Sequence, residues 1–313
     1  MEQFEARVRR GGSGTEAQTD AVALRSGDRD APFRIAAQCV SVAAAAPEHL
    51  VEVYDGLAEG WLGRAPASPA IGAEAEPGAV PGPLWDAFWE LVFDPQAGRD
   101  PADITVRTAA LTGLLPPEFH RRVAAMALRY PGVAEAAAAG VPPRFTLDAL
   151  AACPAGSLGG QLHALVVDDG FDLEVLDRDA LALAGLPAPL DYLNVRILQC
   201  HDIWHLVAGY ETTGLHEVAI SGFQMGQFGH QYSSMFLALV LTKVAFTEPF
   251  EGAGFLLDTI LSSYTHGRET PPLLGVEWEA IWDRPVSDIR SARGVVPYDS
   301  PYPAGLLEQL RSA

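Results

Sequence analysis

Two histidines and two carboxylates lie close together in the segment HDIWHLVAGYETTGLHE, which spans residues 201–217. His201 and His205 are four residues apart, so on a helix their imidazoles lie one above the other on the same face. Asp202 follows about 100° further round that helix. Glu217 comes early in the next helix, after a short glycine-bounded turn, and an antiparallel arrangement would return its carboxylate to the same face. These residue types at this spacing predict a site for zinc or another divalent first-row metal.

A simpler interpretation is that these histidines are ordinary packed residues. The pattern H-D-x-x-H-x(11)-E requires four positions to agree, however, and we expect it by chance in about one such sequence per thousand. Cys200 projects away from His205, and we interpret it as a packing residue. We interpret His216 and His230 as core or solvent-facing histidines. Four further histidines have no partner at ligand spacing: His49, His120, His163 and His266.

The elements that must position these side chains are predicted to be helices. Apolar residues recur at helical spacing in 190–210, which carries the histidine pair, and a long stretch over 215–246 follows it. Further helices are expected at 33–46, 47–62, 84–93, 117–130, 134–139, 157–169, 251–264 and 276–290. Strict alternation of β-branched residues is almost absent. The sequence therefore predicts an all-α fold, a bundle-like single domain over residues 31–300, with residues 1–30 as a disordered tail and 63–83 as a connector.

Composition argues against several classes of protein. The chain has 313 residues, of which 49% are hydrophobic, and its three cysteines are widely scattered. No apolar run reaches the roughly 18 residues of a membrane-spanning helix, and no secretory signal is evident. The formal net charge of -19 disfavours binding to phosphate backbones, so we expect no nucleic acid partner.

At the metal motif the chain resembles the ubiquinone (coenzyme Q) biosynthesis protein family of the Coq4 type, which acts on C1 of a polyprenylated ring. The family's motif matches His201, Asp202, His205 and Glu217. Flanking matches lie in the segment CPAGSLG at 153–159, at Tyr192 and Arg196, and in the closing segments 277–279 and 288–290. The resemblance covers residues 153–296. The chain departs from the family pattern at Ala155, Gly160, Gly275 and Val276, where charged residues are usual, which suggests a shifted substrate preference.

The resemblance implies an activity: metal-dependent removal of the C1 carboxylate from a polyprenylated 4-hydroxybenzoate precursor, by an oxidative or a non-oxidative route. It implies that His201, Asp202, His205 and Glu217 are the catalytic and metal-binding residues, with Asp202 either a direct ligand or a residue that orients an imidazole. It further implies contact with other ubiquinone-biosynthesis proteins. A lipid substrate also implies a cytoplasmic protein held peripherally on the inner face of the membrane, with a homodimer as a compatible assembly.

Two alternatives stay open at this point. One is a non-catalytic organiser, in which a structural metal stabilises a prenyl-lipid-binding scaffold for a biosynthetic complex. The other is a metal-dependent hydrolase, although no further ligand set for one emerges from the chain. The aromatic and methionine residues of 223–236 fit either a tail-binding wall or core packing, and we favour the core. Three glycines there, Gly222, Gly226 and Gly229, predict close approach of another helix or the floor of a groove.

Overall fold

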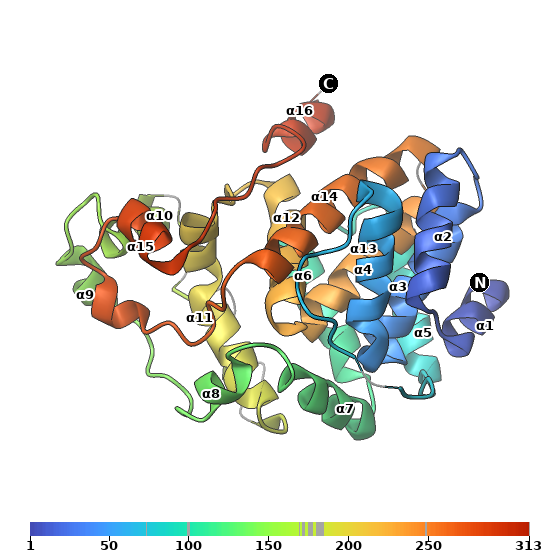
Figure 1. The fold of residues 1–313 in the computed structure, drawn as a ribbon, viewed down its shortest axis with the longest axis horizontal. Helices are drawn as coiled ribbons and strands as arrows, with labels where there is room; N and C mark the ends of the chain where they lie inside the picture. The colour runs from blue at the N-terminus through green and yellow to red at the C-terminus, as the bar shows by residue number, and fades with distance from the viewer. Residues whose placement is uncertain are drawn as a thin grey trace. The chain divides into compact units, whose positions relative to one another are not determined.

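The computed structural model describes the chain apart from residues 73, 99–100, 169, 171–172, 175–177, 180–184, 248 and 313. Within this part the regular elements are helices (Figure 1), so the predicted all-α fold is confirmed. No helix among the described residues is both long enough and apolar enough to cross a membrane. The chain folds into two compact units.

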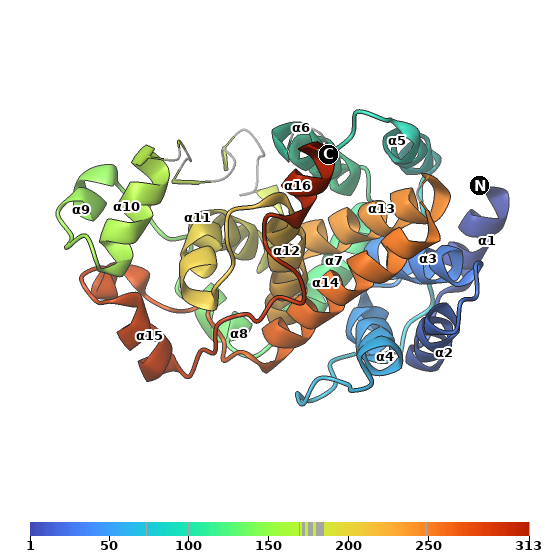
Figure 2. The same ribbon diagram turned by 90° about the horizontal axis from the view of Figure 1, so that it is seen from above.

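The first unit comprises Met1–Met126, Thr213–Glu269 and Ser300–Ala313. Its helices are α1 (Glu2–Arg10), α2 (Gly14–Arg25), α3 (Ala31–Ala44), η1 (Pro47–His49), α4 (Leu50–Leu62), α5 (Gly82–Phe93), α6 (Pro101–Gly113), α7 (Pro117–Ala127), α12 (Gly214–Phe228), α13 (Gln231–Thr247), α14 (Phe250–Glu269) and α16 (Leu306–Ser312). In this unit α2 lies beside α4 and α12 beside α14, as both ribbon views show (Figures 1 and 2).

Glycines allow a close helix crossing in the first unit, between α12 and α14. A Cβ atom on Gly226 would lie 2.5 Å from the Tyr264 carbonyl oxygen, and one on Gly267 would collide with the Phe223 carbonyl oxygen. Neither position is compatible with a side chain, so the two backbones touch only because glycine is present on both. The predicted close approach at Gly226 is therefore confirmed.

The predicted disordered tail is wrong, because residues 2–25 form α1 and α2. Phe4 is fully buried in an aromatic cluster, with ring centroids 5.3 Å from Phe33, 5.3 Å from Trp89 and 5.6 Å from Phe246. Buried Asp20 of α2 accepts hydrogen bonds from two side chains of α3. The N-terminal segment is polar in composition, but apolar side chains of both its helices are packed into the core.

The second unit comprises Ala127–Thr212 and Thr270–Asp299. Its helices are α8 (Val133–Ala137), α9 (Leu147–Ala151), α10 (Leu158–Asp168), α11 (Leu190–Ala208), η3 (Trp278–Ile281) and α15 (Val286–Arg293). The central helix α11 contacts α8, α10 and α15. Trp204 and Trp278 are among the largest fully buried side chains of this unit.

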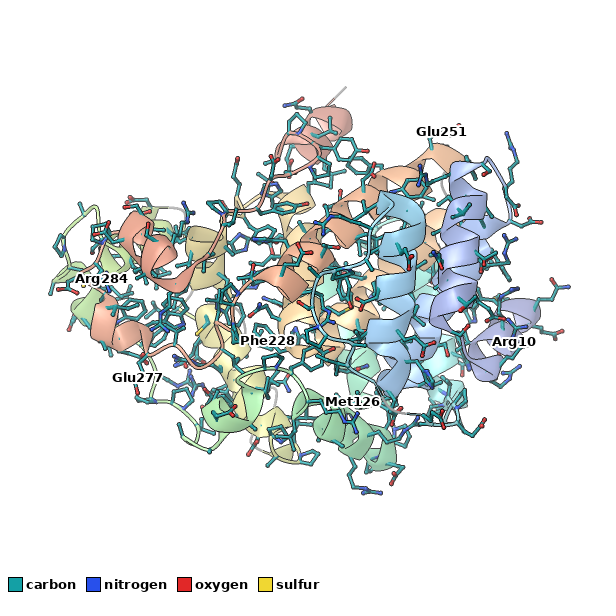
Figure 3. All side chains as sticks on the ribbon, viewed as in Figure 1. Arg10, Met126, Phe228, Glu251, Glu277 and Arg284 are labelled. Atoms are coloured by element: carbon teal, nitrogen blue, oxygen red, sulfur yellow. The ribbon has the colours of Figure 1, made fainter. Side chains whose placement is uncertain are left out.

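The long stretch expected over 215–246 is two helices, which is a second correction. Gly229 has a φ of 63° and ends α12, and α13 begins at Gln231. Of the residues that could form a tail-binding wall, Phe223, Met225 and Phe228 are all buried, which agrees with the core interpretation. Phe228 is labelled in Figure 3.

Candidate metal centre

The histidine pair lies on the last two turns of α11, in the second unit. His205 is 2% exposed and His201 is half-buried. Their spacing of four residues brings the two Nε2 atoms to 3.1 Å and the ring centroids to 4.7 Å. The predicted placement of these imidazoles on one face of a helix is thus confirmed.

The loop after α11 fixes the protonation pattern of His205. Its Nδ1 lies 3.2 Å from the carbonyl oxygen of Tyr210. A carbonyl oxygen can only accept, so Nδ1 carries the proton and Nε2 presents its lone pair toward His201. Histidine ligands of metals commonly make this second hydrogen bond, which sets the tautomer and the orientation of the ring.

The C-terminus of α11 is held in place by its own unit. Gly209 follows the helix with a φ of 85°, and a Cβ there would lie 2.9 Å from Pro297. The Arg290 guanidinium of α15 donates to the carbonyl oxygens of Leu206 (2.7 Å) and Val207 (2.9 Å). These carbonyls are orphans at the helix end, and a cation is also favoured there by the helix dipole. The turn that carries His205 is therefore anchored on both sides.

Glu217 lies in the first turn of α12, in the first unit. The Thr213 side chain caps this helix by accepting from the backbone amide of His216, and its hydroxyl donates to the Ala304 carbonyl oxygen at 2.9 Å. The Glu308 carboxylate of α16 accepts from the amide of Gly214 at 2.8 Å. A carboxylate in a first helical turn interacts favourably with the helix dipole.

Tyr232 of α13 shares the electrostatic surroundings of Glu217 in the first unit. Burial and, to a smaller extent, the negative charge of Glu217 raise the pKa of the Tyr232 hydroxyl to about 12, against the opposing effect of a hydrogen bond with Thr105. Tyr232 is therefore a neutral phenol at physiological pH and does not compete with Glu217 as an anionic ligand.

His201, His205 and Glu217 form a candidate metal-binding group. Asp202, the fourth predicted ligand, does not belong to it and is 7% exposed on α11. Cys200 is fully buried and burial raises the pKa of its thiol to about 12, which suits the packing role expected from the sequence. His216 and His230, interpreted from the sequence as core or solvent-facing residues, are both buried and stand outside the group.

The geometry of the histidine pair fits a metal ion. Two nitrogen ligands on a tetrahedral zinc, each at about 2.05 Å, are separated by about 3.3 Å. The 3.1 Å between the two Nε2 atoms is close to that value. Borderline nitrogen donors with a carboxylate are the donor set of zinc and its first-row neighbours. The residues present therefore fit such an ion.

The groups that position His205 and the start of α12 were not predicted from the sequence. The Tyr210 carbonyl is a backbone acceptor, so no residue type marks it, although Gly209 was available as a helix-ending signal. Glu308 lies on α16, a helix that was not expected. Thr213 could have been recognised, because threonine before an apolar helix is a typical N-cap.

Tyr192 and Arg196, which flank the metal motif in the sequence, lie on the face of α11 opposite to the histidine pair. Tyr192 and Arg196 each precede one of the histidines by nine residues, which is about 180° around a helix. The Arg196 guanidinium donates to the Val276 carbonyl oxygen at 2.6 Å and lies 3.5 Å from the Glu279 carboxylate. Tyr192 and Arg196 therefore belong to a part of the second unit that is separate from the histidine pair.

The departure at Gly160 has a steric reason. A Cβ atom there would collide with the Pro154 carbonyl oxygen, and one on Gly159 would lie 2.7 Å from the Cys153 sulfur. The turn that opens α10 is folded so tightly that no side chain fits at position 160. The local backbone therefore excludes a charged side chain at position 160.

Comparison with known proteins gives a consistent result. Residues 143–299 match the family described as "Coenzyme Q (ubiquinone) biosynthesis protein Coq4". Among individual proteins, the mitochondrial ubiquinone biosynthesis protein COQ4 homologue of Drosophila ananassae is 27% identical over 149 residues, 47% of this chain and 53% of that protein. The homologue of Drosophila melanogaster is 28% identical over 127 residues, 40% of this chain and 46% of that protein. The chain spans about half the length of these relatives.

A solved structure shares the fold. The crystal structure of a putative ubiquinone biosynthesis protein from Nostoc punctiforme PCC 73102 aligns with a TM-score of 0.51 and 24% sequence identity. The alignment covers 68% of this chain and 96% of that one. At this identity the match shows that the helical fold is shared.

Proposed function

The chain belongs to the Coq4 family of coenzyme Q (ubiquinone) biosynthesis proteins, and from that membership we propose that it is a metal-dependent decarboxylase of this pathway. The substrate is a polyprenylated 4-hydroxybenzoate-type ring, and the bond that breaks joins C1 to its carboxylate. The observation that carries the proposal is the histidine pair of α11, whose Nε2 atoms lie 3.1 Å apart. The Tyr210 carbonyl oxygen sets the tautomer of His205 through its Nδ1 atom.

In this proposal His201, His205 and Glu217 hold a divalent first-row metal such as zinc. The two imidazoles bind through Nε2 as neutral ligands, and Glu217 supplies a negative charge from the following helix. The connection between the two helices is short, from Gly209 to Thr213. Asp202 is adjacent to His201 in sequence and is proposed to orient the ligands rather than to bind directly. When bound, a divalent ion would act as a Lewis acid toward negative charge on the substrate.

The protein's own residues prepare the site for that chemistry. The Tyr210 carbonyl keeps the His205 ring in one orientation, and Arg290 keeps the end of α11 from fraying. Burial of His205 at 2% exposure excludes water from one side of the site, so charges there interact more strongly than in bulk solvent. The carbon dioxide that leaves takes the carboxylate carbon with it, and a proton must then replace it on C1 in a non-oxidative route.

Lipid substrates also bear on where the protein acts. We propose that the chain contacts a membrane surface peripherally, since its substrate carries a polyprenyl tail. We also propose that it works beside other ubiquinone-biosynthesis proteins, as the names of its relatives suggest.

The test is turnover by purified protein of measured metal content. Incubation with a prenylated 4-hydroxybenzoate should yield a product lighter by the carboxylate, detected by mass spectrometry. Glu217→Gln should abolish turnover while the melting temperature stays near that of the wild type. Glu251→Gln, an exposed carboxylate in the first turn of α14, is the matched control and should keep full activity. Metal binding without turnover in any metal-loaded form would instead favour a scaffold.

A further inference from the structure

A cavity of about 740 Å³ opens within the second unit, on the face of α11 away from the histidine pair. Tyr192 and Arg196 line it. These are the two residues that lie about 180° around the helix from His201 and His205. The cavity is therefore distinct from the candidate metal centre. Its volume falls in the range of about 300–1,000 Å³ that small-molecule sites occupy.

Part of the lining of this cavity is apolar. Ala136 and Val276 line it and are buried, with 6% and 2% exposure. Pro142, Pro143 and Pro272 contribute to its walls. Such a lining favours the apolar body of a ligand over a hydrated ion.

The charge of Arg196 is balanced within the protein. Its side chain is 5% exposed, its guanidinium donates to the Val276 carbonyl oxygen, and the Glu279 carboxylate lies 3.5 Å away. A cation so paired gives little attraction to an incoming anion, because Glu279 would repel it.

The rim of the cavity carries carboxylates whose charge is not balanced in this way. Glu135 and Glu277 line the cavity and are exposed, and neither side chain forms an ion pair or hydrogen bond among the described residues. Glu277 lies at the surface of the unit (Figure 3). Arg293 is the corresponding cation at the rim. The balance is one negative charge, in a chain whose net charge is -19.

Tyr192 supplies a polar group inside the cavity. Tyr192 is 6% exposed, and its hydroxyl makes no hydrogen bond in the described part of the chain. Burial raises its pKa, so the hydroxyl stays protonated and neutral at physiological pH. A largely buried tyrosine with an unused hydroxyl in a cavity is typical of a group that meets a ligand.

We propose that this cavity binds a small organic cation, an ammonium or amidinium group on an apolar body. The apolar body lies against Ala136 and Val276. The cation faces Glu135 and Glu277, and the Tyr192 hydroxyl accepts one of its hydrogen bonds. This site is independent of the metal centre and of the proposed decarboxylation.

The experiment compares three probes of one shape on the full chain: 1-naphthylmethylamine, 1-naphthaleneacetate and 1-naphthylmethanol. Titration calorimetry should give a dissociation constant for the amine at least about tenfold below those of the anion and the alcohol. Its affinity should fall as salt is added, since the rim carboxylates are exposed. Equal or tighter binding of the anion, or no binding of any probe, would overturn the proposal.

Variants locate the binding. The isosteric double variant Glu135→Gln/Glu277→Gln should weaken the amine about tenfold, and Tyr192→Phe should weaken it about threefold. The control double variant Glu2→Gln/Glu59→Gln makes the same charge change at exposed positions of the first unit and should leave the affinity unchanged. Thermal melts establish that each variant is folded. Unchanged affinity in a folded Glu135→Gln/Glu277→Gln protein would show that the cavity is not a cation site.

Discussion

The Nδ1 atom of His205 lies 3.2 Å from the carbonyl oxygen of Tyr210, five residues further along the chain. The backbone amide of Tyr210 in turn donates to the His205 carbonyl oxygen at 2.9 Å. The two residues therefore hold each other through side chain and backbone, and this holds the imidazole in one tautomer. The arrangement depends on Gly209, whose left-handed conformation turns the chain back toward the helix.

Gly209→Ala should therefore weaken metal binding without touching a ligand. The substitution requires a side chain at φ 85° and against Pro297, so it should lower stability by about 1–2 kcal/mol. Displacing the Tyr210 carbonyl should lower metal affinity about 10- to 100-fold, as for other orienting groups. Chelator competition measures the affinity.

Gly63→Ala is the control for that experiment. Gly63 follows α4 in the same left-handed conformation, with φ 79°, and a Cβ there would meet nothing within 4 Å. Gly63→Ala should also lower stability, because alanine is strained in this backbone conformation, but it should leave the metal affinity unchanged. Equal metal affinity in the wild type and Gly209→Ala would contradict the orienting role of Tyr210.

The roles of Asp202 and Glu217 can be separated by metal stoichiometry. Glu217→Gln removes a proposed ligand and should reduce bound metal well below one equivalent under chelator. Asp202→Asn should retain one equivalent with a smaller loss of affinity, because Asp202 stands outside the ligand group. Elemental analysis after dialysis gives the stoichiometry. The reverse order of effects would make Asp202 the ligand.

The parts of the fold that the sequence predicted well are those with a wide apolar stripe. α11 was expected at 190–210 and runs over Leu190–Ala208, because its apolar residues recur on several successive turns. α1 was missed because only Phe4 and Val8 are buried in a helix of nine residues, too few for a period to stand out. The break at Gly229 was missed because glycine spacing fits both a close helix crossing and a helix end.

The same limit applies to the candidate centre. Side-chain ligands have a spacing, so His201 and His205 could be predicted from the sequence. The Tyr210 carbonyl and the Arg290 contacts at the end of α11 depend on tertiary structure, and main-chain acceptors leave no residue-type signal.

The aromatic cluster around Phe4 should control the folding of the N-terminus. Phe4→Ala removes a fully buried ring and should lower the free energy of unfolding by about 3–5 kcal/mol. Hydrogen exchange should then increase across α1. Val22→Ala, at a side chain that is 49% exposed, is the control and should change stability by less than about 0.5 kcal/mol. Unchanged exchange in Phe4→Ala would contradict a packed N-terminus.

His49 should make stability depend on pH in the neutral range. Burial alone would lower its pKa, but the carbonyl oxygen of Ala75 at 3.0 Å and the carboxylate of Glu52 at 3.1 Å outweigh burial and hold the pKa above its usual value. Because the folded pKa is raised, the stabilisation is fully present below about pH 6.5 and is lost as pH rises through the folded pKa.

His49→Gln should accordingly lose more stability at pH 6 than at pH 9. The difference should stay below about 1 kcal/mol, because the pair is largely solvent-screened. Urea unfolding at both pH values measures it. A pH-independent effect of His49→Gln would show that its hydrogen bonds do not depend on the charged ring.

The crossing of α12 and α14 gives the most direct test of the fold that presents Glu217. Gly226→Ala places a methyl group 2.5 Å from the Tyr264 carbonyl oxygen. Because this oxygen belongs to the backbone, it cannot move aside by a change of rotamer as a side-chain atom could. We expect a loss of about 1–3 kcal/mol from overpacking, larger than the gain of up to about 1 kcal/mol that alanine gives in a helix. Gly113, at the end of α6, has nothing within 4 Å of a Cβ position, so Gly113→Ala should be neutral or slightly stabilising. Thermal unfolding of both variants distinguishes steric crossing from helix propensity, because propensity alone would stabilise both.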